Sequence, residues 1–308
     1  MDERAALRML DTALPSAGDD AAVVDGQVVT TDMLHDATDF PDGTTRYTAG
    51  WRSVGASLSD VAAMGAEATS AVAVYAAPEF DESELLDFVA GASDVCESVD
   101  AAYVGGDLDQ HVEFTVATTA LGETEDPVLR SGAEPGDAVC VTGALGRSGA
   151  GFRYFQRWQD DGDEAALERA NDLFQFPPRV AAGGALAEYA SSMMDSSDGL
   201  ARSLHQIAEA SDCGVAIDSD RLPVHDGIEA VAMDAEDRLE LTTFFGEDFE
   251  LVLTVPAADL DAAQAACPIP LTKVGDVTEP GPADATEQPA LTMDGAALPD
   301  RGYTHGGD

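Results

Sequence analysis

The stretch that decides the fold of the amino-terminal half is Arg46-Tyr-Thr-Ala-Gly-Trp-Arg-Ser-Val-Gly-Ala-Ser-Leu-Ser-Asp-Val-Ala-Ala-Met-Gly65, followed by Ser70-Ala-Val-Ala-Val-Tyr-Ala-Ala77. The first segment repeats apolar side chains at three- and four-residue spacing, and these are Trp51, Val54, Leu58, Val61 and Met64. This spacing predicts an amphipathic helix that ends near Gly65. The second segment is short and apolar, and it predicts a buried strand.

Further elements surround this helix and strand. Residues 21–31 are rich in β-branched side chains and predict a β-hairpin with its turn at Asp25-Gly26. Residues 82–99 predict a second helix, and residues 101–104 and 112–121 predict two more strands. The resulting order, β-β-α-β-α-β-β, forms a complete α+β unit.

A cluster of Glu, Asp, Pro and Gly at residues 122–136 predicts a domain boundary, and we expect domains at residues 1–130 and 131–308. Strands and helices alternate after it, so the chain is predicted to have a two-domain α/β (α+β) fold with mixed sheets flanked by helices. Residues 159–171 form a polar acidic segment, and residues 279–288 predict a loop or extended connection. The strands predicted here are 138–142, 192–194, 215–217 and 250–255, and the helices are 149–158, 179–190, 200–210 and 227–232.

The charge balance is strongly acidic. The 308 residues carry a net charge of −44, from 59 acidic and 15 basic side chains, and Lys273 is the single lysine. Such a chain has no general attraction to DNA, RNA or an anionic membrane. An acidic, lysine-poor composition resembles that of a halophile's cytoplasmic protein, whose self-repulsion is screened in molar salt by a Debye length of ~3 Å. A disordered acidic protein is excluded because 45% of the residues are hydrophobic and patterned.

The cysteines and the amino terminus bear on localisation. The four cysteines are widely scattered without a C-x-x-C pair, which is typical of a reducing compartment and indicates neither a disulfide framework nor a zinc site. The amino terminus lacks the layout of a signal peptide, and the longest apolar run, residues 71–78, is too short to span a bilayer. These features predict a soluble cytoplasmic protein.

Several common catalytic motifs do not occur in the sequence. Lys273 stands between Thr272 and Val274, so there is no Walker A loop, and no H-R-D, G-x-S-x-G or H-E-x-x-H motif is found. The five histidines lack metal-ligand spacing. The glycine-rich residues 143–151 follow a strand and open a helix, where they could cradle a phosphate. They do not match G-x-G-x-x-G, and a plain tight turn is the favoured interpretation.

Six short acidic motifs carry the chemistry. Apolar, strand-like residues lead into several of them, which places carboxylates at the ends of core elements, where hard cations such as Mg²⁺ find oxygen ligands. Their aspartates are too many for one acid–base pair, and they suit several Mg²⁺ ions that bridge polyphosphate oxygens and stabilise phosphoryl transfer. A chain with 44 excess negative charges can hold phosphates best through such ions. The motifs are Gly18-Asp-Asp20, Thr30-Thr-Asp32, Ser59-Asp60, Gly105-Gly-Asp107, Asp195-Ser-Ser-Asp-Gly199 and Gly246-Glu-Asp248.

In their order along essentially the whole chain, these motifs resemble those of the thiamine-monophosphate kinases, in the superfamily of aminoimidazole ribonucleotide synthetase and selenophosphate synthetase. The segment Arg130-Ser-Gly-Ala-Glu-Pro-Gly-Asp137 also resembles the interdomain segment of that family. The resemblance implies a fold like that of aminoimidazole ribonucleotide synthetase. An amino-terminal domain that binds ATP and Mg²⁺ would pair with its twin in a homodimer, and a carboxy-terminal α/β domain would follow.

The resemblance also implies the activity. The γ-phosphoryl group of ATP, as co-substrate, would pass directly to the phosphate of thiamine monophosphate, with several Mg²⁺ ions and without a covalent phosphoenzyme. The Mg²⁺ ligands would be Asp20, Thr30, Thr31, Asp32, Asp60, Asp107, Asp195 and Asp198, with Asp32, Asp60 and Asp107 as the catalytic members. The nucleotide contacts would be Gly106, Asp107, Arg130 and Ser197. The contacts with the thiamine substrate would be Asp39, Glu247 and Tyr303.

Three positions depart from the family pattern, which often has His at Asp39, Asn at Ser57 and Gly at Phe245, and they bear on substrate contacts more than on metal contacts. Two alternatives stay open: another ATP-dependent synthetase of the same superfamily, and a non-catalytic nucleotide- or thiamine-binding protein. Selenophosphate synthetase needs a reactive Cys or selenocysteine with Lys near its amino terminus, and neither precedes Cys96. The complete set of carboxylates argues against a non-catalytic protein.

Overall fold

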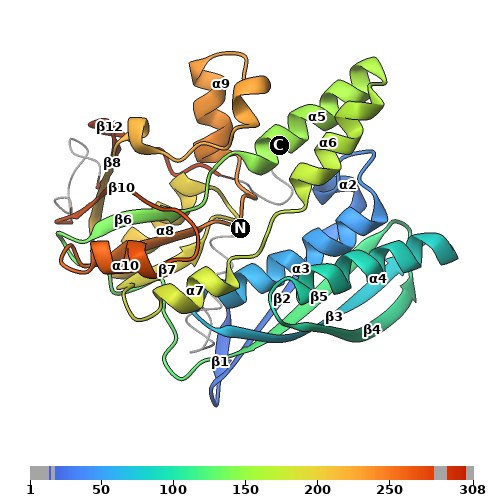
Figure 1. Cartoon of the computed structure of the whole chain (residues 1–308), viewed down its shortest axis with the longest axis horizontal. Coiled ribbons are helices and arrows are strands. Elements are labelled where there is room, and N and C mark those ends of the chain that lie inside the picture. Colours follow the sequence, from blue (N-terminus) through green and yellow to red (C-terminus); the bar gives the residue numbers. More distant parts are fainter. Residues whose placement is uncertain (1–13, 15–17, 281–289, 303–308) are drawn as a thin grey trace.

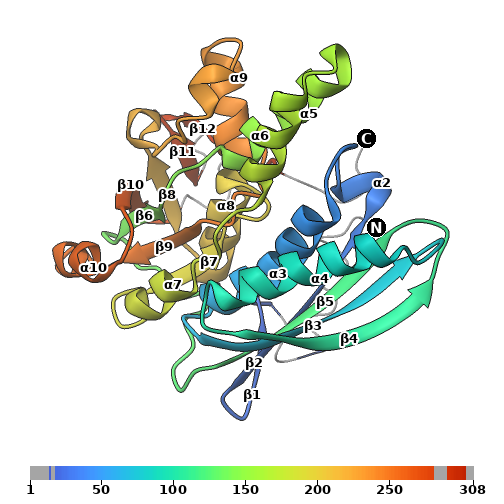
Figure 2. The same cartoon turned by 45° about the vertical axis from the view of Figure 1, so that its right-hand side comes forward.

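The structure, a computed structural model, describes residue 14 and residues 18–280 and 290–302. The amino-terminal half contains β1 (Ala22–Val24), β2 (Gln27–His35), α2 (Asp36–Asp39), α3 (Arg46–Ala63), β3 (Glu67–Ala77), α4 (Glu82–Glu97), β4 (Ala102–Gln110) and β5 (Thr115–Glu123). Its strands form one sheet in the order β1-β2-β5-β3-β4. Helices α3 and α4 lie side by side on one face of this sheet (Figure 2).

The order predicted for this half is confirmed, with the short helix α2 as an addition. The hairpin forms as expected: Val24 pairs with Gln27 across a turn in which Asp25 and Gly26 have φ angles of 52° and 83°. Strand β4 runs on through Gly105-Gly-Asp107 to Gln110, beyond the four residues predicted. Glycine is required at Gly106, because a Cβ there would lie 1.6 Å from the carbonyl oxygen of Ala73 on β3.

Helix α3 is the centre of the molecule. It begins at the N-cap Thr45, whose side chain accepts a hydrogen bond from the backbone N–H of Thr48. Its middle is buried on the sheet, with Val54 and Leu58 wholly inaccessible to solvent. Its last turn packs against α7 (Val180–Leu186) of the other half, in a cluster that holds Ala62, Ala63 and Leu186. This helix therefore joins the two halves.

The carboxy-terminal half forms a seven-stranded mixed sheet in the order β12-β11-β8-β10-β6-β9-β7 (Figure 1; Figure 2). Its strands are β6 (Ala138–Thr142), β7 (Ser192–Asp195), β8 (Gly214–Ile217), β9 (Leu251–Val255), β10 (Leu271–Thr278), β11 (Leu291–Met293) and β12 (Ala296–Ala297). Its helices include α5 (Arg147–Asp161), α6 (Glu164–Phe174), α8 (Leu200–Ser211), α9 (Ala235–Leu239) and α10 (Leu260–Ala266). The π-helix η3 (Glu240–Phe244) follows α9.

Several sequence-based predictions for this half need correction. The polar segment 159–171 is mostly helical, because α6 starts at Glu164 behind the N-cap Asp163. The helix expected at 227–232 is a single 3-10 turn, Ile228–Ala230. Elements α9, α10 and β10 to β12 were not predicted at all. Residues 281–289, most of the predicted loop at 279–288, lie outside the described residues.

All four cysteines are free and buried. In the part of the chain that the structure describes, no helix is both long and apolar enough to cross a membrane.

Candidate active site

Three of the predicted metal ligands meet at the junction between the two halves. Asp20 precedes β1, Asp60 lies one turn before the end of α3, and Asp195 is the last residue of β7. One carboxylate oxygen from each lies within 4.8 Å of the others. The fold thus gathers three aspartates that are far apart in the sequence, and we call them the aspartate cluster.

The aspartate cluster is electrostatically unfavourable without a cation. Burial raises the pKa of Asp60 well above its ordinary value, and the charges of Asp32, Asp195 and Asp20 raise it further. Burial, followed by the charge of Asp20, raises the pKa of Asp195 to about 7. Oδ2 of Asp195 is buried and has no hydrogen-bond partner among the described residues. A shared cation would relieve both the repulsion and the unpaired oxygen.

Two side chains on β2 extend the aspartate cluster. Thr30 Oγ1 donates a hydrogen bond to Oδ2 of Asp60 at 2.5 Å. Asp32 lies on the same face of the strand, where its Oδ2 accepts a hydrogen bond from Ser57 Oγ of α3 at 2.8 Å. Ser57 in turn shares a 2.7 Å hydrogen bond with Thr118 of β5. These contacts fix the orientation of Asp32 toward the helix that carries Asp60.

Arg130, a predicted nucleotide contact, lies beside the aspartate cluster. Its Nη2 and Nε are 3.0 and 3.2 Å from the two carboxylate oxygens of Asp20. Its backbone N–H donates to Asp19 at 2.8 Å. A guanidinium in this position adds a fixed positive charge next to three carboxylates, and it lies where a phosphate bound to a clustered cation would be in reach.

Two other predicted metal ligands, Thr31 and Asp107, point away from the aspartate cluster. Asp107 is paired in register with Val74 of β3, and both are exposed, whereas Ala73 and Tyr75 on either side of Val74 are buried under the helices. Thr31 follows Thr30 on β2 and therefore faces the opposite side of the sheet. The sheet separates these two residues from the aspartate cluster within one chain.

Two loops bring the predicted residues Ser197, Asp198 and Glu247 together. Ser197 and Asp198 lie between β7 and α8, and Ser197 Oγ donates to Oδ1 of Asp195 at 2.6 Å. The loop with Gly246 and Glu247 packs directly on this turn. The N–H of Glu247 donates to the carbonyl of Ser197 at 2.6 Å, and a Cβ on Gly246 would lie 2.6 Å from the same oxygen. A hydrogen bond therefore joins the turn that carries the predicted metal ligand Asp198 to the loop that carries the predicted substrate contact Glu247.

Glu247 and Asp39, both predicted substrate contacts, line one cavity of about 300 Å³. The cavity lies between the segment after β2 and the α5–α6 region. Asp39 is buried and accepts hydrogen bonds from the N–H of His35 at 2.7 Å and from the hydroxyl of Thr38 at 2.8 Å. The other walls are mainly aromatic and apolar: Ala37, Thr38, Phe40, Pro41, Phe152, Phe174 and Phe245. Carboxylates set among aromatic rings suit a flat, positively charged heterocycle.

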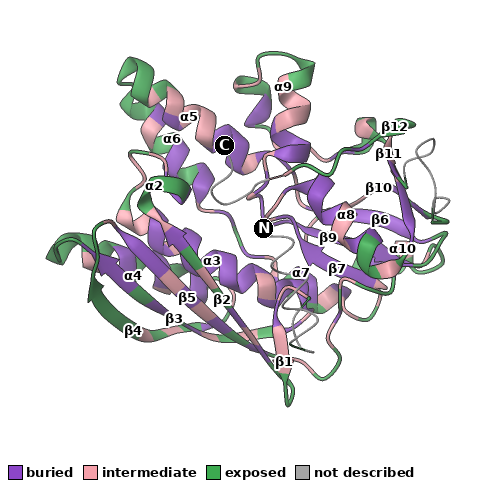
Figure 3. Cartoon of the chain, turned by 180° about the vertical axis from the view of Figure 1, so that it is seen from behind, coloured by how far each residue is buried: buried purple, intermediate pink, exposed green. Residues whose placement is uncertain are grey.

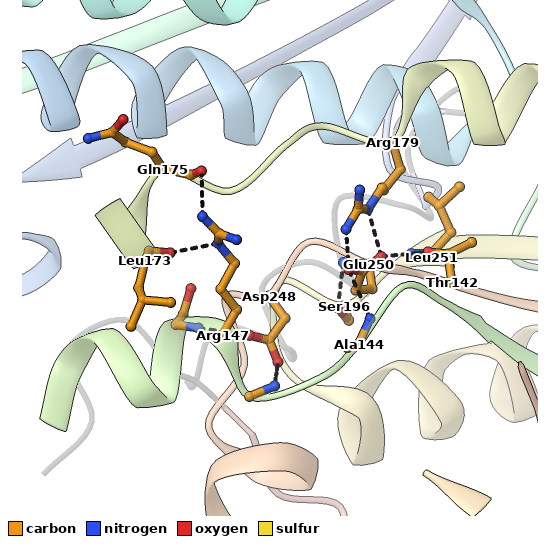
Figure 4. Close-up of polar contacts among 12 residues, drawn as sticks. Thr142, Ala144, Arg147, Leu173, Gln175, Arg179, Ser196, Asp248, Glu250 and Leu251 are labelled. Atoms are coloured by element: carbon orange, nitrogen blue, oxygen red, sulfur yellow. Dashed lines mark hydrogen bonds and ion pairs between the residues drawn. The ribbon is translucent and has the colours of Figure 1, made fainter. Parts of the chain in front are cut away.

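The acids that follow Glu247 hold the loop in place (Figure 4). Asp248 accepts hydrogen bonds from the N–H groups of Gly146 and Ser148 at the start of α5, at 2.5 and 3.0 Å. Glu250 pairs with Arg179. The start of α5 is therefore capped by an internal carboxylate, which supports the tight-turn interpretation of residues 143–151 over a phosphate cradle.

Residues 18–124 match the family model for AIR synthase related protein, N-terminal domain, and residues 134–285 match the C-terminal domain of the same proteins. A thiamine-monophosphate kinase of Halobacterium salinarum is 60% identical over 305 residues, covering 99% of this chain and 100% of the relative. This chain belongs to the thiamine-monophosphate kinase family.

A second relative and a solved structure agree with this membership. The thiamine-monophosphate kinase of Methanospirillum hungatei is 39% identical, with 99% of both chains covered. The structure of AaThiL complexed with AMPPCP and TMP superposes with a TM-score of 0.86 at 26% identity, covering 99% of this chain and 97% of the other. The predicted family and its two-domain α/β fold are confirmed.

The three positions that depart from the thiamine-monophosphate kinase family pattern all lie at the site. Ser57 holds Asp32, whereas Asp39 and Phe245 line the aromatic cavity. Phe245 lies 5.5 Å from Phe152 between ring centroids. Tyr303 lies outside the described residues, although Gly302 before it packs on the Asp198 loop, where a Cβ would come within 2.1 Å of the Asp198 carbonyl oxygen.

No sequence pattern indicated the aromatic pair on α5 and α6 or the buried arginine on α3 that contact Glu247 or line the cavity with it. Phe152 and Phe174 lie on α5 and α6, and no motif marks them. Arg52 of α3 is wholly buried and contacts Glu247, with 2.9 Å between Nη2 and Oε2. The apolar periodicity of α3 and α6 could have suggested that these two helices pack together. It could not have identified Glu247 as the partner of Arg52.

Proposed function

We propose that this protein transfers the γ-phosphoryl group of ATP to the phosphate of thiamine monophosphate. The observation that carries the proposal is the hydrogen bond between Glu247, which lines the aromatic cavity, and Ser197, in the turn that follows Asp195 of the aspartate cluster. One end suits metal-bound phosphates, and the other suits a cationic heterocycle. Family membership supports the same activity, and so does the AaThiL structure, which holds TMP with AMPPCP, an ATP analogue.

The length of α3 relates the two ends of this site. Arg52 contacts Glu247 and Phe174 of the cavity wall, whereas Asp60 belongs to the aspartate cluster. Eight residues of α-helix separate them, a rise of about 12 Å. A ligand with a ring system at one end and a phosphate at the other could therefore contact both regions at once.

The donor set fits Mg²⁺, because it consists of hard carboxylate and hydroxyl oxygens with one buried carboxylate oxygen unpaired. We assign Asp20, Asp60 and Asp195 as the central ligands, with Thr30, Asp32 and Asp198 nearby. Bound Mg²⁺ would neutralise the polyphosphate charge and align the phosphates for in-line displacement. Arg130 adds positive charge for the nucleotide, and Ser197 orients Asp195. We propose Asp32, Asp60 and Asp107 as the catalytic members, as the family resemblance implies.

The reaction needs no protein nucleophile. A phosphate oxygen of thiamine monophosphate forms a new bond to the γ-phosphorus, the bond from that phosphorus to the β,γ-bridging oxygen breaks, and ADP leaves with the electron pair. The acceptor oxygen is already deprotonated near neutral pH, so the residues of the site act by positioning and charge stabilisation. The direct test is incubation with Mg-ATP and thiamine monophosphate in molar KCl, followed by detection of thiamine diphosphate.

If no thiamine diphosphate forms but ATP is consumed when another acceptor is added, a different synthetase of the superfamily is favoured. ATP binding without turnover would favour a non-catalytic binding protein. Gly106 is predicted to touch the nucleotide. The close approach of β3 is by itself enough to require glycine at this position. The domain division at residue 130, with ATP, Mg²⁺ and dimer functions in residues 1–130, is part of the proposal.

The role of Glu247 in substrate recognition can be isolated kinetically. Glu247→Gln is expected to raise KM for thiamine monophosphate by about tenfold or more, because a charge-assisted contact with the substrate is lost. The KM for ATP should change by less than about twofold. Glu97→Gln, at the exposed end of α4, serves as the matched control, and circular dichroism checks folding. Equal changes in both KM values, or no change, would remove Glu247 from substrate recognition.

We propose that the protein is a homodimer that pairs through the uncovered face of the five-stranded sheet. Among the described residues, this face has the exposed apolar side chains Met33, Val72 and Val74, with exposed fractions of 56%, 36% and 41%. The edge strand β4 is exposed along most of its length (Figure 3). Exposed apolar side chains gathered on one face are typical of an interface. Asp107 and Thr31 lie on this face, which supports a role for them at the site of the partner subunit.

Mixed dimers test this arrangement. Asp60→Asn and Asp107→Asn are each expected to be inactive alone. When the two variants are unfolded together and refolded, half of the dimers are mixed, and each mixed dimer has one intact site. Turnover should then recover to about a quarter of the wild-type value. Subunit exchange is verified with two affinity tags, and mixed dimers without recovered activity would mean that Asp107 acts within its own chain.

The acidic composition and the free buried cysteines support a cytoplasmic, halophilic protein. The similarity to a kinase of Halobacterium salinarum agrees with this. No nucleic acid or membrane partner is expected from a surface with this charge.

A further inference from the structure

Arg52 is a buried cation at the boundary of the aromatic cavity. Its side chain has no solvent exposure, and it projects from α3. Nη2 is 2.9 Å from Oε2 of Glu247 and 3.3 Å from the carbonyl oxygen of the same residue. Nη1 donates to the carbonyl of Phe174 at 3.0 Å, and both nitrogens lie 3.3 Å from Ser148 Oγ. One guanidinium thus contacts α5, the end of α6 and the Glu247 loop.

Arg52 touches two walls of the cavity. Phe174, which lines the cavity, has its ring 4.3 Å from the central guanidinium carbon. Glu247, on another wall, has one carboxylate oxygen bound by Arg52. The contacts of Arg52 therefore reach both the aromatic surface and the charged group that would face the substrate.

We infer that Arg52 is a positioning residue that sets substrate specificity by holding Glu247 in the cavity wall. The inference rests on the proposed function. Binding of Oε2 to Arg52 leaves Oε1 of the same carboxylate for a cationic or hydrogen-bonding ring. The two bonds to Glu247, at its carboxylate and its carbonyl, fix the side chain and the backbone together.

The backbone of this loop needs such support. Glu247 has a φ angle of 59°, and Phe249 has one of 54°, values that non-glycine residues rarely adopt. Asp248 between them is fastened to the start of α5. Arg52 is the cation that fixes Glu247 itself. Its Nε is buried without a hydrogen-bond partner among the described residues, so the guanidinium is oriented toward Glu247 at the expense of its own hydrogen bonding.

Arg147 offers a matched comparison. It also ties α5 to the end of α6, through hydrogen bonds to the carbonyls of Leu173 and Gln175 (Figure 4) and to the carbonyl of Asp172. It shares the structural function of Arg52 but has no contact with Glu247 in the described hydrogen bonds. A substitution at Arg147 therefore reports what loss of packing alone does to the enzyme.

The experiment compares Arg52→Met with Arg147→Met in molar KCl. Arg52→Met is expected to raise KM and the calorimetric Kd for thiamine monophosphate by about ten- to hundredfold, because a hydrogen-bonded charge no longer holds Glu247. The KM for ATP should change by less than about twofold in both variants. Arg147→Met should lower the melting temperature without this selective change. Equal changes in the two KM values for Arg52→Met would overturn the inference.

A double substitution separates positioning from general structure. If Arg52 acts through Glu247, Arg52→Met added to Glu247→Gln should change KM for thiamine monophosphate by less than about twofold, whereas independent effects would multiply. Arg52→Lys keeps the positive charge but loses the planar set of N–H donors of the guanidinium, and it should give an intermediate KM for thiamine monophosphate. If Arg52→Met does not fold, Arg52→Lys is compared with Arg147→Lys, and identical KM values for thiamine monophosphate would refute the inference. A wild-type protein that does not phosphorylate thiamine monophosphate would instead refute the proposed function.

Discussion

Replacing Asp60 with Asn is expected to lower turnover of Mg-ATP and thiamine monophosphate by about a thousandfold or more, because one charge is removed from a site where several carboxylates share cations. The fold should survive. Thr30 can still donate its hydrogen bond to the amide oxygen, and the mutual repulsion with Asp32, Asp195 and Asp20 falls. In EDTA the melting temperature of the variant should equal or exceed that of the wild type.

The loss of the metal site can be measured apart from activity. Added MgCl2 should raise the melting temperature of the wild type by mass action and that of Asp60→Asn much less. Asp261→Asn, on the exposed side of α10, is the control for removal of a surface charge. Circular dichroism checks that each variant is folded. A folded Asp60→Asn protein with more than about a tenth of wild-type turnover would show that Asp60 has no part in phosphoryl transfer.

The elements that the sequence predicted well are those with a clear apolar period. Helix α3 and strand β3 form where hydrophobic spacing places them, but β3, which was predicted as a buried strand, buries one face and exposes Val72 and Val74 on the other. Helix α6 was missed because its charged face dominates the composition of residues 159–171. Its buried side, Ala166, Ala170 and Leu173, follows helical spacing behind the N-cap Asp163, so the signal was present but weak.

The order of acidic motifs predicted a metal site, but the sequence could not assign each acid to one face. Asp20, Asp60 and Asp195 come together as expected. Thr30 and Thr31 are adjacent in a strand, so their side chains must face opposite sides of the sheet. Applied to the sequence alone, that rule already excludes a site that both threonines share within one chain. The position of Asp107 required the register between β4 and β3.

The cavity was the least predictable part of the site. Arg52 and Glu247 are separated by 195 positions, and no local pattern links them. Burial of an arginine depends on the partners that surround it, and those come here from α5, the end of α6 and the Glu247 loop. A sequence pattern can identify Glu247 by its motif, but only tertiary structure identifies the residue that holds it.

Stability is expected to rise strongly between dilute buffer and molar KCl. The net charge of −44 is spread over a surface with few bases, and several arginines are used internally: Arg52, Arg147 and Arg179 contact carbonyls or buried acids. Screening should relieve repulsion at a small cost, because exposed pairs such as Arg169–Asp172 contribute only ~0–1 kcal/mol each. A relief of about 4 kcal/mol would raise the melting temperature of a chain this long by about 6 °C.

A charge-neutralised variant distinguishes screening from a general effect of salt on apolar burial. Four acids line one recess near the β1–β2 turn: Asp25, Glu67, Glu123 and Glu125. Converting them to Asn or Gln should raise the melting temperature in dilute buffer and flatten its dependence on KCl, because less repulsion remains to be screened. If salt acted only by strengthening burial of apolar surface, the variant and the wild type would keep parallel curves. A wild-type melting temperature that is flat or falls toward molar KCl would contradict the halophilic interpretation itself.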